Sequence, residues 1–287
     1  MFHMEHFGGF LQQQHCKLRP LCYNREESTK GGASLGTVVA IVNQKGGVGK
    51  STTAVNLSAA LGKLGRSVLI ADLDPQGNST SGYGVNKKGL TRTAYRVLMG
   101  ECRASEAILP TRFANADILP ADSALYGAEV EMVELENRTM MLRKSLTEVR
   151  DRYDFIFFDC PPSLGLITLN ALTAADSILV PLQCEFYSLE GLTQLMDTVR
   201  LVKQRYNPDL DIFGLLFTMF DGRLNLTSQV VREVKRHFSD RVFRTQVPRN
   251  VRISEAPSFG EPVVYYDRTS KGAEAYMKLA EEILKRR

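Results

Sequence analysis

Short continuous runs of apolar residues recur along the chain, separated by segments in which apolar residues return every three or four positions. The short runs are rich in β-branched and aromatic residues and cover residues 38–42, 68–72, 155–159, 178–182 and 212–217, and residues 242–247 are a sixth candidate strand. A bounded apolar run of this length is typical of a strand buried on both faces of a sheet. The pattern therefore predicts six buried strands.

Helical periodicity fills the segments between these runs. In 51–64, Ala54, Leu57 and Leu61 fall on one helical face, and Gly65 follows as a stop signal. The other predicted helices cover residues 123–150, 163–175, 189–206, 227–238 and 270–285. Strands that alternate with helices predict an α/β fold, with a doubly wound, mostly parallel sheet covered by helices on both faces.

The first 36 residues differ from the rest of the chain. They hold three of the four histidines and a run of three glutamines, and they lack the apolar stretch of a secretory signal. We expect residues 1–36 to be a disordered or mis-annotated N-terminal extension, and residues 37–287 to form one domain.

Composition narrows the class of protein. Hydrophobic residues make up 44% of the 287-residue chain, which is enough for a packed core and excludes global disorder. No apolar stretch approaches the ~18 residues of a membrane span. The five cysteines form no C-x-x-C pair, which argues against a thiolate zinc site or a disulfide framework.

A glycine-rich segment joins the first predicted strand to the first predicted helix, and it reads Lys45-Gly-Gly-Val-Gly-Lys-Ser51. Glycines let backbone N–H groups turn toward phosphate oxygens, and the helix that follows adds the positive end of its dipole. Lys50 is placed to reach the β- and γ-phosphates, and the Ser51 hydroxyl to bind Mg²⁺. The common P-loop pattern is not met, because Gln44 replaces its first glycine and Lys45 is an additional lysine. The predicted nucleotide-binding residues here are Lys45, Gly46, Gly47, Val48, Gly49, Lys50, Ser51 and Thr52.

Three aspartates follow predicted strands, at the sheet edge where ligands bind in doubly wound folds. Asp159 ends the run 155–159, Asp72 ends the run 68–72, and Asp74 follows two positions later. A carboxylate in this position can hold Mg²⁺, and phosphoryl transfer to water needs a group that orients the water. The sequence by itself does not rank Asp72 and Asp74 for the second task.

Positive charge is concentrated late in the chain. Residues 223–252 carry eight basic and two acidic side chains, a net charge of +6 against +4 for the whole chain. Two interpretations are open: a solvated helix face with scattered arginines, or a surface that binds a polyanion.

The motif at 45–51 resembles the deviant Walker A signature of the ParA/Soj-type chromosome- and plasmid-partitioning ATPases, which are similar to the MinD-type division-site ATPases. Further blocks that resemble the chromosomal branch cover residues 43–45, 72–78, 159–164, 185–191 and 248–258. The resemblance extends over residues 37–287 and implies a P-loop ATPase domain that uses ATP and Mg²⁺.

The resemblance also implies roles for single residues. Asp159 corresponds to the Walker B aspartate, Asp74 to the residue that orients the attacking water, and Asp72 to a residue that supports the Mg²⁺ shell. Lys45 corresponds to the signature lysine, which reaches the partner's phosphates in an ATP-bound sandwich dimer. The expected catalytic residues are therefore Lys45 and Asp74, and the expected metal site is Ser51, Asp72 and Asp159.

Further expectations concern the base and the partners. The resemblance places adenine against Pro248 and Asn250, and non-specific double-stranded DNA against Arg223 and Arg252. It implies a homodimer that forms with ATP, a ParB-type centromere-binding protein that stimulates hydrolysis, and a cytoplasmic, nucleoid-associated protein.

The main alternative is a membrane-associated spatial regulator of the division-site type, which needs a C-terminal amphipathic membrane helix. Here the last helical segment has its apolar residues on what we expect to be a core-facing stripe, so no stable membrane association is expected. The stripe consists of Ala273, Tyr276, Met277, Ala280, Ile283 and Leu284. A nitrogenase-type metal-cluster carrier is disfavoured, because Cys160 and Cys184 lack the required spacing.

Overall fold

The computed structural model describes residues 35–286. The predicted N-terminal extension lies outside the described residues except for Leu35 and Gly36. Gly36 is joined to the fold at its backbone, because its N–H donates to the Arg150 carbonyl at 3.1 Å.

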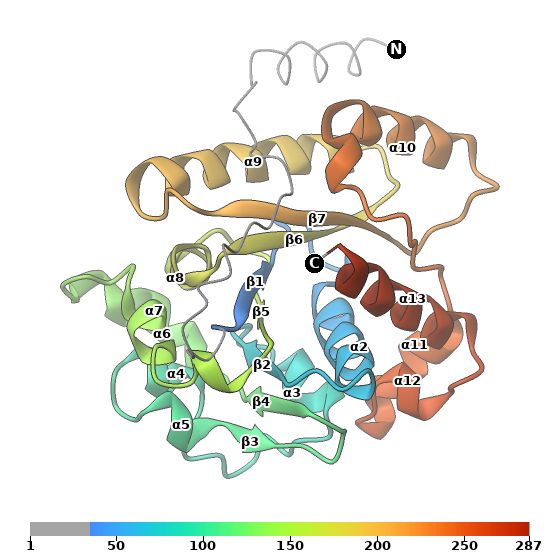
Figure 1. Ribbon diagram of the computed structural model, residues 1–287. Helices are drawn as coiled ribbons and strands as arrows, with labels where there is room; N and C mark the ends of the chain where they lie inside the picture. The colour runs from blue at the N-terminus through green and yellow to red at the C-terminus, as the bar shows by residue number, and fades with distance from the viewer. Residues whose placement is uncertain (1–34, 287) are drawn as a thin grey trace, which may run out of the picture.

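One seven-stranded sheet forms the centre of the molecule, in the order β3-β4-β2-β5-β1-β6-β7 (Figure 1). Every pairing is parallel except that of β3 with β4. The strands are β1 (Thr37–Ile41), β2 (Val68–Asp72), β3 (Leu109–Pro110), β4 (Ala116–Leu119), β5 (Phe155–Asp159), β6 (Ser177–Gln183) and β7 (Asp211–Thr218). The predicted α/β class and doubly wound, mostly parallel sheet are confirmed.

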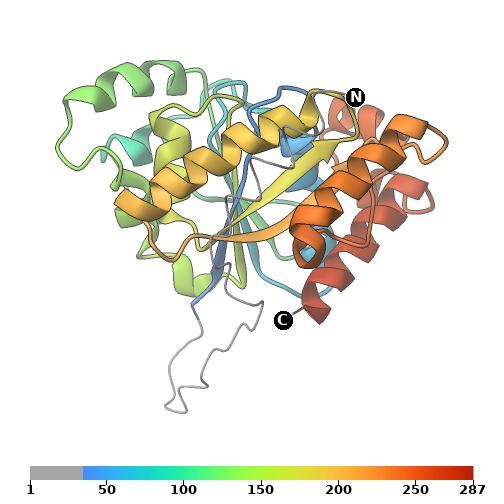
Figure 2. The ribbon, with the colours of Figure 1, turned by 90° about the horizontal axis from the view of Figure 1, so that it is seen from above.

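Helices cover both faces of this sheet. One apolar core includes residues of α2, α12 and α13, and the other includes residues of α4 and of α6 to α10. Figure 2 shows α9 and α10 in front of the edge formed by β6 and β7. The helices are α2 (Lys50–Lys63), α3 (Asn78–Gly82), α4 (Ala94–Leu98), α5 (Ala104–Ala107), α6 (Leu125–Glu131), α7 (Met141–Leu146), α8 (Leu166–Ala174), α9 (Ser188–Arg205), α10 (Asn225–Phe238), α11 (Val251–Glu255), α12 (Val263–Tyr266) and α13 (Lys271–Lys285).

Five of the six predicted strands correspond to β1, β2, β5, β6 and β7, with ends that differ by a residue or two. The sixth prediction, a strand at 242–247, is wrong. Val242 and Pro248 make only isolated bridges to Leu215 and Phe220. Between these bridges the chain leaves the sheet, because the backbone N–H groups of Arg244 and Thr245 donate to the Glu282 carboxylate of α13 at 2.8 and 2.9 Å.

The prediction of one helix over 123–150 is also wrong. The structure has α6, a 3₁₀ turn at Met132–Glu134, α7 and a second 3₁₀ turn at Arg150–Arg152. The break between α6 and α7 includes Asn137, whose φ of 57° is left-handed and incompatible with a continuing helix. The short elements β3, β4, α3 to α5, α11 and α12 were not predicted, because segments of this length give little periodicity.

Candidate functional site

The glycine-rich segment forms a loop between β1 and α2. Gly47 and Gly49 have φ values of 74° and 89°, which side-chain-bearing residues rarely adopt. A Cβ atom added to Gly46 or Gly47 would meet nothing within 4 Å, so open space lies beside the loop. Ser51 and Thr52 stand in the first turn of α2, which starts at Lys50. The loop therefore presents backbone N–H groups and a helix N-terminus to this space.

Lys50 is buried beside this loop without a bonded counter-anion. Its side chain donates to the Lys45 carbonyl at 3.3 Å, its one hydrogen-bond acceptor among residues 35–286. Burial lowers the pKa of Lys50, and the nearby carboxylates of Asp159 and Asp74 offset part of that effect. A buried ammonium group with so few partners is stabilised by an additional anion.

Asp159 and Asp72 end two adjacent strands and are paired in the register of β5 and β2. Both are fully buried. Burial raises the pKa of both carboxyl groups, and the charge of Asp159 raises that of Asp72 further. Two buried carboxylates side by side create a need for a cation.

The oxygen atoms of these carboxylates are used differently. Asp159 accepts a hydrogen bond from the Ser79 hydroxyl at 2.7 Å on Oδ2, while its buried Oδ1 accepts none from the described residues. Asp72 accepts bonds from the Thr80 N–H and hydroxyl, both at 2.7 Å, and from the Asp74 N–H at 3.3 Å. The Ser51 hydroxyl helps to lower the pKa of Asp159, so these two side chains are near neighbours. Asp159 Oδ1 with Ser51 therefore fits a magnesium site, and Asp72 fits a supporting position.

The Asp74 carboxylate accepts fewer hydrogen bonds than the Asp72 carboxylate. Its Oδ1 accepts from the Gln76 N–H at 2.9 Å, and its Oδ2 accepts no hydrogen bond from residues 35–286. The side chain is close enough to raise the pKa of Lys50. Because Asp72 is bonded on both oxygens, Asp74 is the better placed of the two to hold a water molecule.

Lys45 stands at the entrance of the loop and forms an ion pair with Glu185, just beyond the end of β6. Both side chains are partly exposed, at 35% and 53%. The Lys45 N–H donates to Asn43 Oδ1 at 3.0 Å, which fixes the backbone at this entrance. Within this chain, the anion that pairs with Lys45 is therefore Glu185.

The residues expected at the adenine end follow the isolated bridge of Phe220 with Pro248. Pro248 lines a cavity of about 430 Å³, together with Arg244, Thr245, Gln246, Lys271, Glu274, Ala275 and Lys278. Asn250 does not line it. Its Oδ1 accepts from the Ile253 N–H at 3.3 Å and caps α11, which leaves the amide NH₂ for a ligand.

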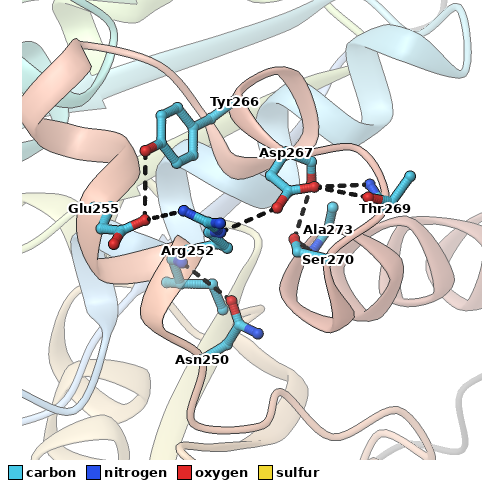
Figure 3. A network of polar contacts seen from close by, with 9 residues as sticks. Asn250, Arg252, Glu255, Tyr266, Asp267, Thr269, Ser270 and Ala273 are labelled. Carbon is cyan, nitrogen blue, oxygen red and sulfur yellow. Dashed lines mark hydrogen bonds and ion pairs between the residues drawn. The ribbon is translucent and has the colours of Figure 1, made fainter.

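Arg252 and Arg223, the residues expected to contact DNA, are both held by acidic neighbours. Arg252 lies between Glu255 and Asp267, at 2.8 and 3.2 Å (Figure 3). Arg223 is 89% exposed and pairs with Asp221 at 2.6 Å. The two arginines lie on different segments, the turn after β7 and helix α11.

One of the eight basic residues between 223 and 252 does not belong to the surface. Arg241 is buried, donates to the Ile212 carbonyl at 2.7 Å and pairs with Asp211 at 3.1 Å. The other seven basic residues are exposed: Arg223, Arg232, Lys235, Arg236, Arg244, Arg249 and Arg252.

Four residues near the loop were not assigned a role from the sequence. Glu185 lies in the segment 185–191, which resembles the family but contains no residue with an expected role, and Gln183 and Thr218 end strands without a sequence pattern that marks them. Met219 has a φ of 48°, and its sulfur atom contacts Gln183 at 2.9 Å and Arg249 at 3.9 Å. Such a conformation of a non-glycine residue is a frequent feature of functional sites, and the sequence carries no signal for it.

The C-terminal helix packs as expected. Ala273, Tyr276, Ala280 and Ile283 are buried in the core shared with α2, and Met277 and Leu284 pack against this core. Among residues 35–286, no helix is both long and apolar enough to cross a membrane.

Comparison with known proteins shows strong similarities. Residues 36–212 match the family model described as an AAA domain. The chain is 51% identical over 273 residues to the chromosome partitioning protein ParA of Myxococcus xanthus, covering 95% of this chain and 96% of that protein. It is 51% identical over 249 residues to the sporulation initiation inhibitor protein Soj of Bacillus subtilis, covering 87% and 98%.

A solved structure is also similar to this chain in sequence and fold. It is the cobyrinic acid a,c-diamide synthase of Mycobacterium smegmatis with a bound ATP analogue and magnesium. The TM-score is 0.77 at 37% identity, with 88% of this chain and 95% of that chain covered.

Proposed function

This chain belongs to the ParA/Soj family of chromosome-partitioning ATPases, and we propose that it hydrolyses ATP to ADP and phosphate in order to reset a DNA-bound dimer. The observation that carries the proposal is the group of Lys50, Asp159 and Asp74 beside an open glycine loop, where a buried cation and buried carboxylates lack sufficient partners. ATP with Mg²⁺ supplies both missing charges. The M. smegmatis structure, with its ATP analogue and magnesium, supports this choice of ligand.

We propose that the loop residues 45–51 and Thr52 bind the phosphates. The N–H groups freed by the glycines surround the oxygens, and Lys50 contacts the terminal phosphates. Ser51 and Asp159 would hold Mg²⁺ directly, and Asp72 would hold it through water. When bound, this ion neutralises charge on the phosphates and makes the reaction Mg²⁺-dependent.

Hydrolysis needs a water molecule aligned with the terminal phosphate. Asp74 would orient it with Oδ2, while the Gln76 N–H holds Oδ1 in place. Lys45 would leave Glu185 and contact the phosphates of a second copy of the chain, where it stabilises charge that develops during transfer. The active form is then a homodimer that forms with ATP.

At the base end, Pro248 would give adenine a rigid apolar face, and the Asn250 NH₂ group would donate to it. Arg223 and Arg252 would contact DNA phosphates without reading bases, because such contacts carry no sequence information. A dimer doubles the number of these contacts. The partner that stimulates hydrolysis would be a ParB-type centromere-binding protein, and the site of action would be the nucleoid.

DNA binding measured with ATP, with ADP and without nucleotide tests this proposal. We expect tight, sequence-independent binding only with ATP. Lys50→Ala should abolish ATP binding and with it DNA binding. Lys63→Ala is the matched control, because Lys63 also donates to a buried carbonyl, that of Val264 at 2.9 Å, but lies at the far end of α2. Equal ATP affinity in the two variants would contradict the proposal.

A further inference from the structure

Two strands other than β1 are attached to the phosphate loop by side chains at their ends. Thr218, the last residue of β7, donates from its hydroxyl to the Val48 carbonyl at 2.8 Å. Gln183, the last residue of β6, donates from its amide to the Gly47 carbonyl at 3.1 Å. Both side chains are buried, with residue exposures of 2% and 8%.

These two bonds act on consecutive peptide groups in the middle of the loop. A carbonyl that is held by the sheet points away from the open side of the loop, and in a glycine-rich turn this favours N–H groups that point toward that side. Thr218 also packs its methyl group toward Gly49, where an added Cβ would lie 3.8 Å away. The side chains thus fix both the direction of the carbonyls and the height of the loop above the sheet.

Asn43 makes a third attachment. Its amide donates to the Pro181 carbonyl of β6 at 2.7 Å, while its Oδ1 accepts from the Lys45 N–H at 3.0 Å. Polar side chains at the ends of β1, β6 and β7, three neighbouring strands, therefore hold the loop from its entrance to its centre.

The end of β7 also holds the segment proposed to contact adenine. The Phe220 N–H donates to the Val247 carbonyl at 2.9 Å, and Phe220 bridges to Pro248. Residues 218–220 consequently contact the phosphate loop at one end and the adenine segment at the other. A shift of Thr218 would change the spacing between the two halves of the nucleotide site.

We infer that Thr218 and Gln183 are positioning residues, which hold the phosphate loop in its nucleotide-binding conformation before ATP arrives. The inference rests on the proposed function, since it concerns the same nucleotide site. Preorganisation of this kind lowers the cost of ordering the loop on binding and so increases affinity. Neither side chain needs to touch the nucleotide.

Thr218→Val tests the inference, since it keeps the shape of the side chain and removes the hydroxyl. In the full-length protein we expect the Kd and KM for ATP to rise by roughly tenfold, with a smaller change in kcat, because bound ATP and the transition state need the same loop conformation. Thr218→Ser retains the hydroxyl and should restore binding. Gln183→Leu should weaken binding in the same direction.

Thr173→Val is the matched control. Thr173 is equally buried and donates to the Leu169 carbonyl at 2.7 Å, but it lies in α8 and does not contact the loop. Its variant should bind ATP as the parent does, even where the melting temperature without nucleotide falls. Thermal unfolding of each variant without nucleotide separates a loss of stability from a loss of binding.

Parent-like ATP affinity in both Thr218→Val and Gln183→Leu would overturn the inference. So would an equal loss of affinity in Thr218→Ser, because the hydroxyl would then not be the cause. A parent protein that does not bind ATP would instead contradict the proposed function. The two failures are distinguished by the parent measured in the same series.

Discussion

Lys45 and Glu185, which are 140 positions apart in the sequence, form an ion pair at the entrance of the phosphate loop. Each group is partly exposed, so the pair contributes little to the stability of the fold. It does set the position of the Lys45 ammonium group in the single chain. A lysine that acts on the phosphates of a second copy must first leave this carboxylate, so the pair opposes dimer formation.

Glu185→Gln should therefore favour the ATP-bound dimer. Without the carboxylate, Lys45 is no longer retained by its own chain, and the gain should not exceed the worth of an exposed ion pair, about fivefold in the dimer dissociation constant. Sedimentation of the protein with ATP at several concentrations measures this constant. Glu190→Gln, on the same segment, is the control. A weaker dimer in Glu185→Gln would show that Glu185 assists dimerisation instead.

The second prediction concerns which chain supplies Lys45. Neither Lys45→Gln nor Asp74→Ala should hydrolyse ATP alone, while both should still bind it. An equal mixture should recover about a quarter of the parental rate, because half of the dimers are mixed and one site in each contains Asp74 and a partner's Lys45. No recovery of phosphate release would mean that both residues act within one chain.

Asp74 and Asp72 should differ when each is replaced by alanine. Asp74→Ala should fold, bind ATP and stay on DNA, with hydrolysis slower by about 10²–10⁴, the usual loss for a group that handles the reacting proton or water. Asp72→Ala should lower the melting temperature as well, because Thr80 and the Asp74 N–H lose their acceptor. The assignment would be reversed if hydrolysis persisted in Asp74→Ala and disappeared in Asp72→Ala.

DNA binding should depend on Arg252 and Arg223. We expect Arg252→Glu and Arg223→Glu to abolish it and leave ATP binding unchanged, since neither residue belongs to the loop. The affinity of the parent should fall with salt by a log–log slope of roughly −0.9 for each phosphate neutralised.

Arg112→Glu is the control for these two variants. Arg112 is also exposed and paired, with Glu261 at 3.0 Å, but it lies outside residues 223–252. If both Arg252→Glu and Arg223→Glu bound DNA with the affinity of the parent, the basic residues would form only a solvated surface and not a DNA-binding one.

Arg241 should prove structural. Arg241→Met leaves the Ile212 carbonyl without its donor and Asp211 without its partner, at a cost of about 2 kcal/mol in the free energy of unfolding. Arg244→Met removes an exposed charge and should change stability by less than about 0.5 kcal/mol. Denaturant unfolding of both variants gives the comparison. A reversed order would place Arg241 among the surface charges.

The sequence determined those parts of the molecule that depend on neighbouring residues. Five strands were recognisable because each is a short apolar run whose residues are mostly buried between the helices on the two faces of the sheet. The phosphate loop was recognisable because Gly47 and Gly49 must take positive φ angles, a requirement visible in the residues themselves. The position of Asp159 at a strand end followed from the same local pattern.

Contacts between residues far apart in the sequence were decided by the tertiary structure alone. The segment 242–247 is not a strand, because the Glu282 carboxylate of α13 accepts hydrogen bonds from two of its backbone N–H groups. Asp72 and Asp74 look equivalent in sequence, yet Thr80 donates two hydrogen bonds to Asp72 and none to Asp74. Arg241 is one of eight basic residues by composition, and only packing against Asp211 removes it from the surface.

The same reason explains the attachment of the phosphate loop to Thr218 and Gln183. A threonine or glutamine at the end of a strand has many possible partners, and no periodicity or spacing distinguishes among them. Their partners are set by the sheet order, which brings β6 and β7 alongside β1. The residues proposed to bind phosphate can thus be recognised from the local sequence, whereas the residues that hold them in place depend on which strands the fold brings together.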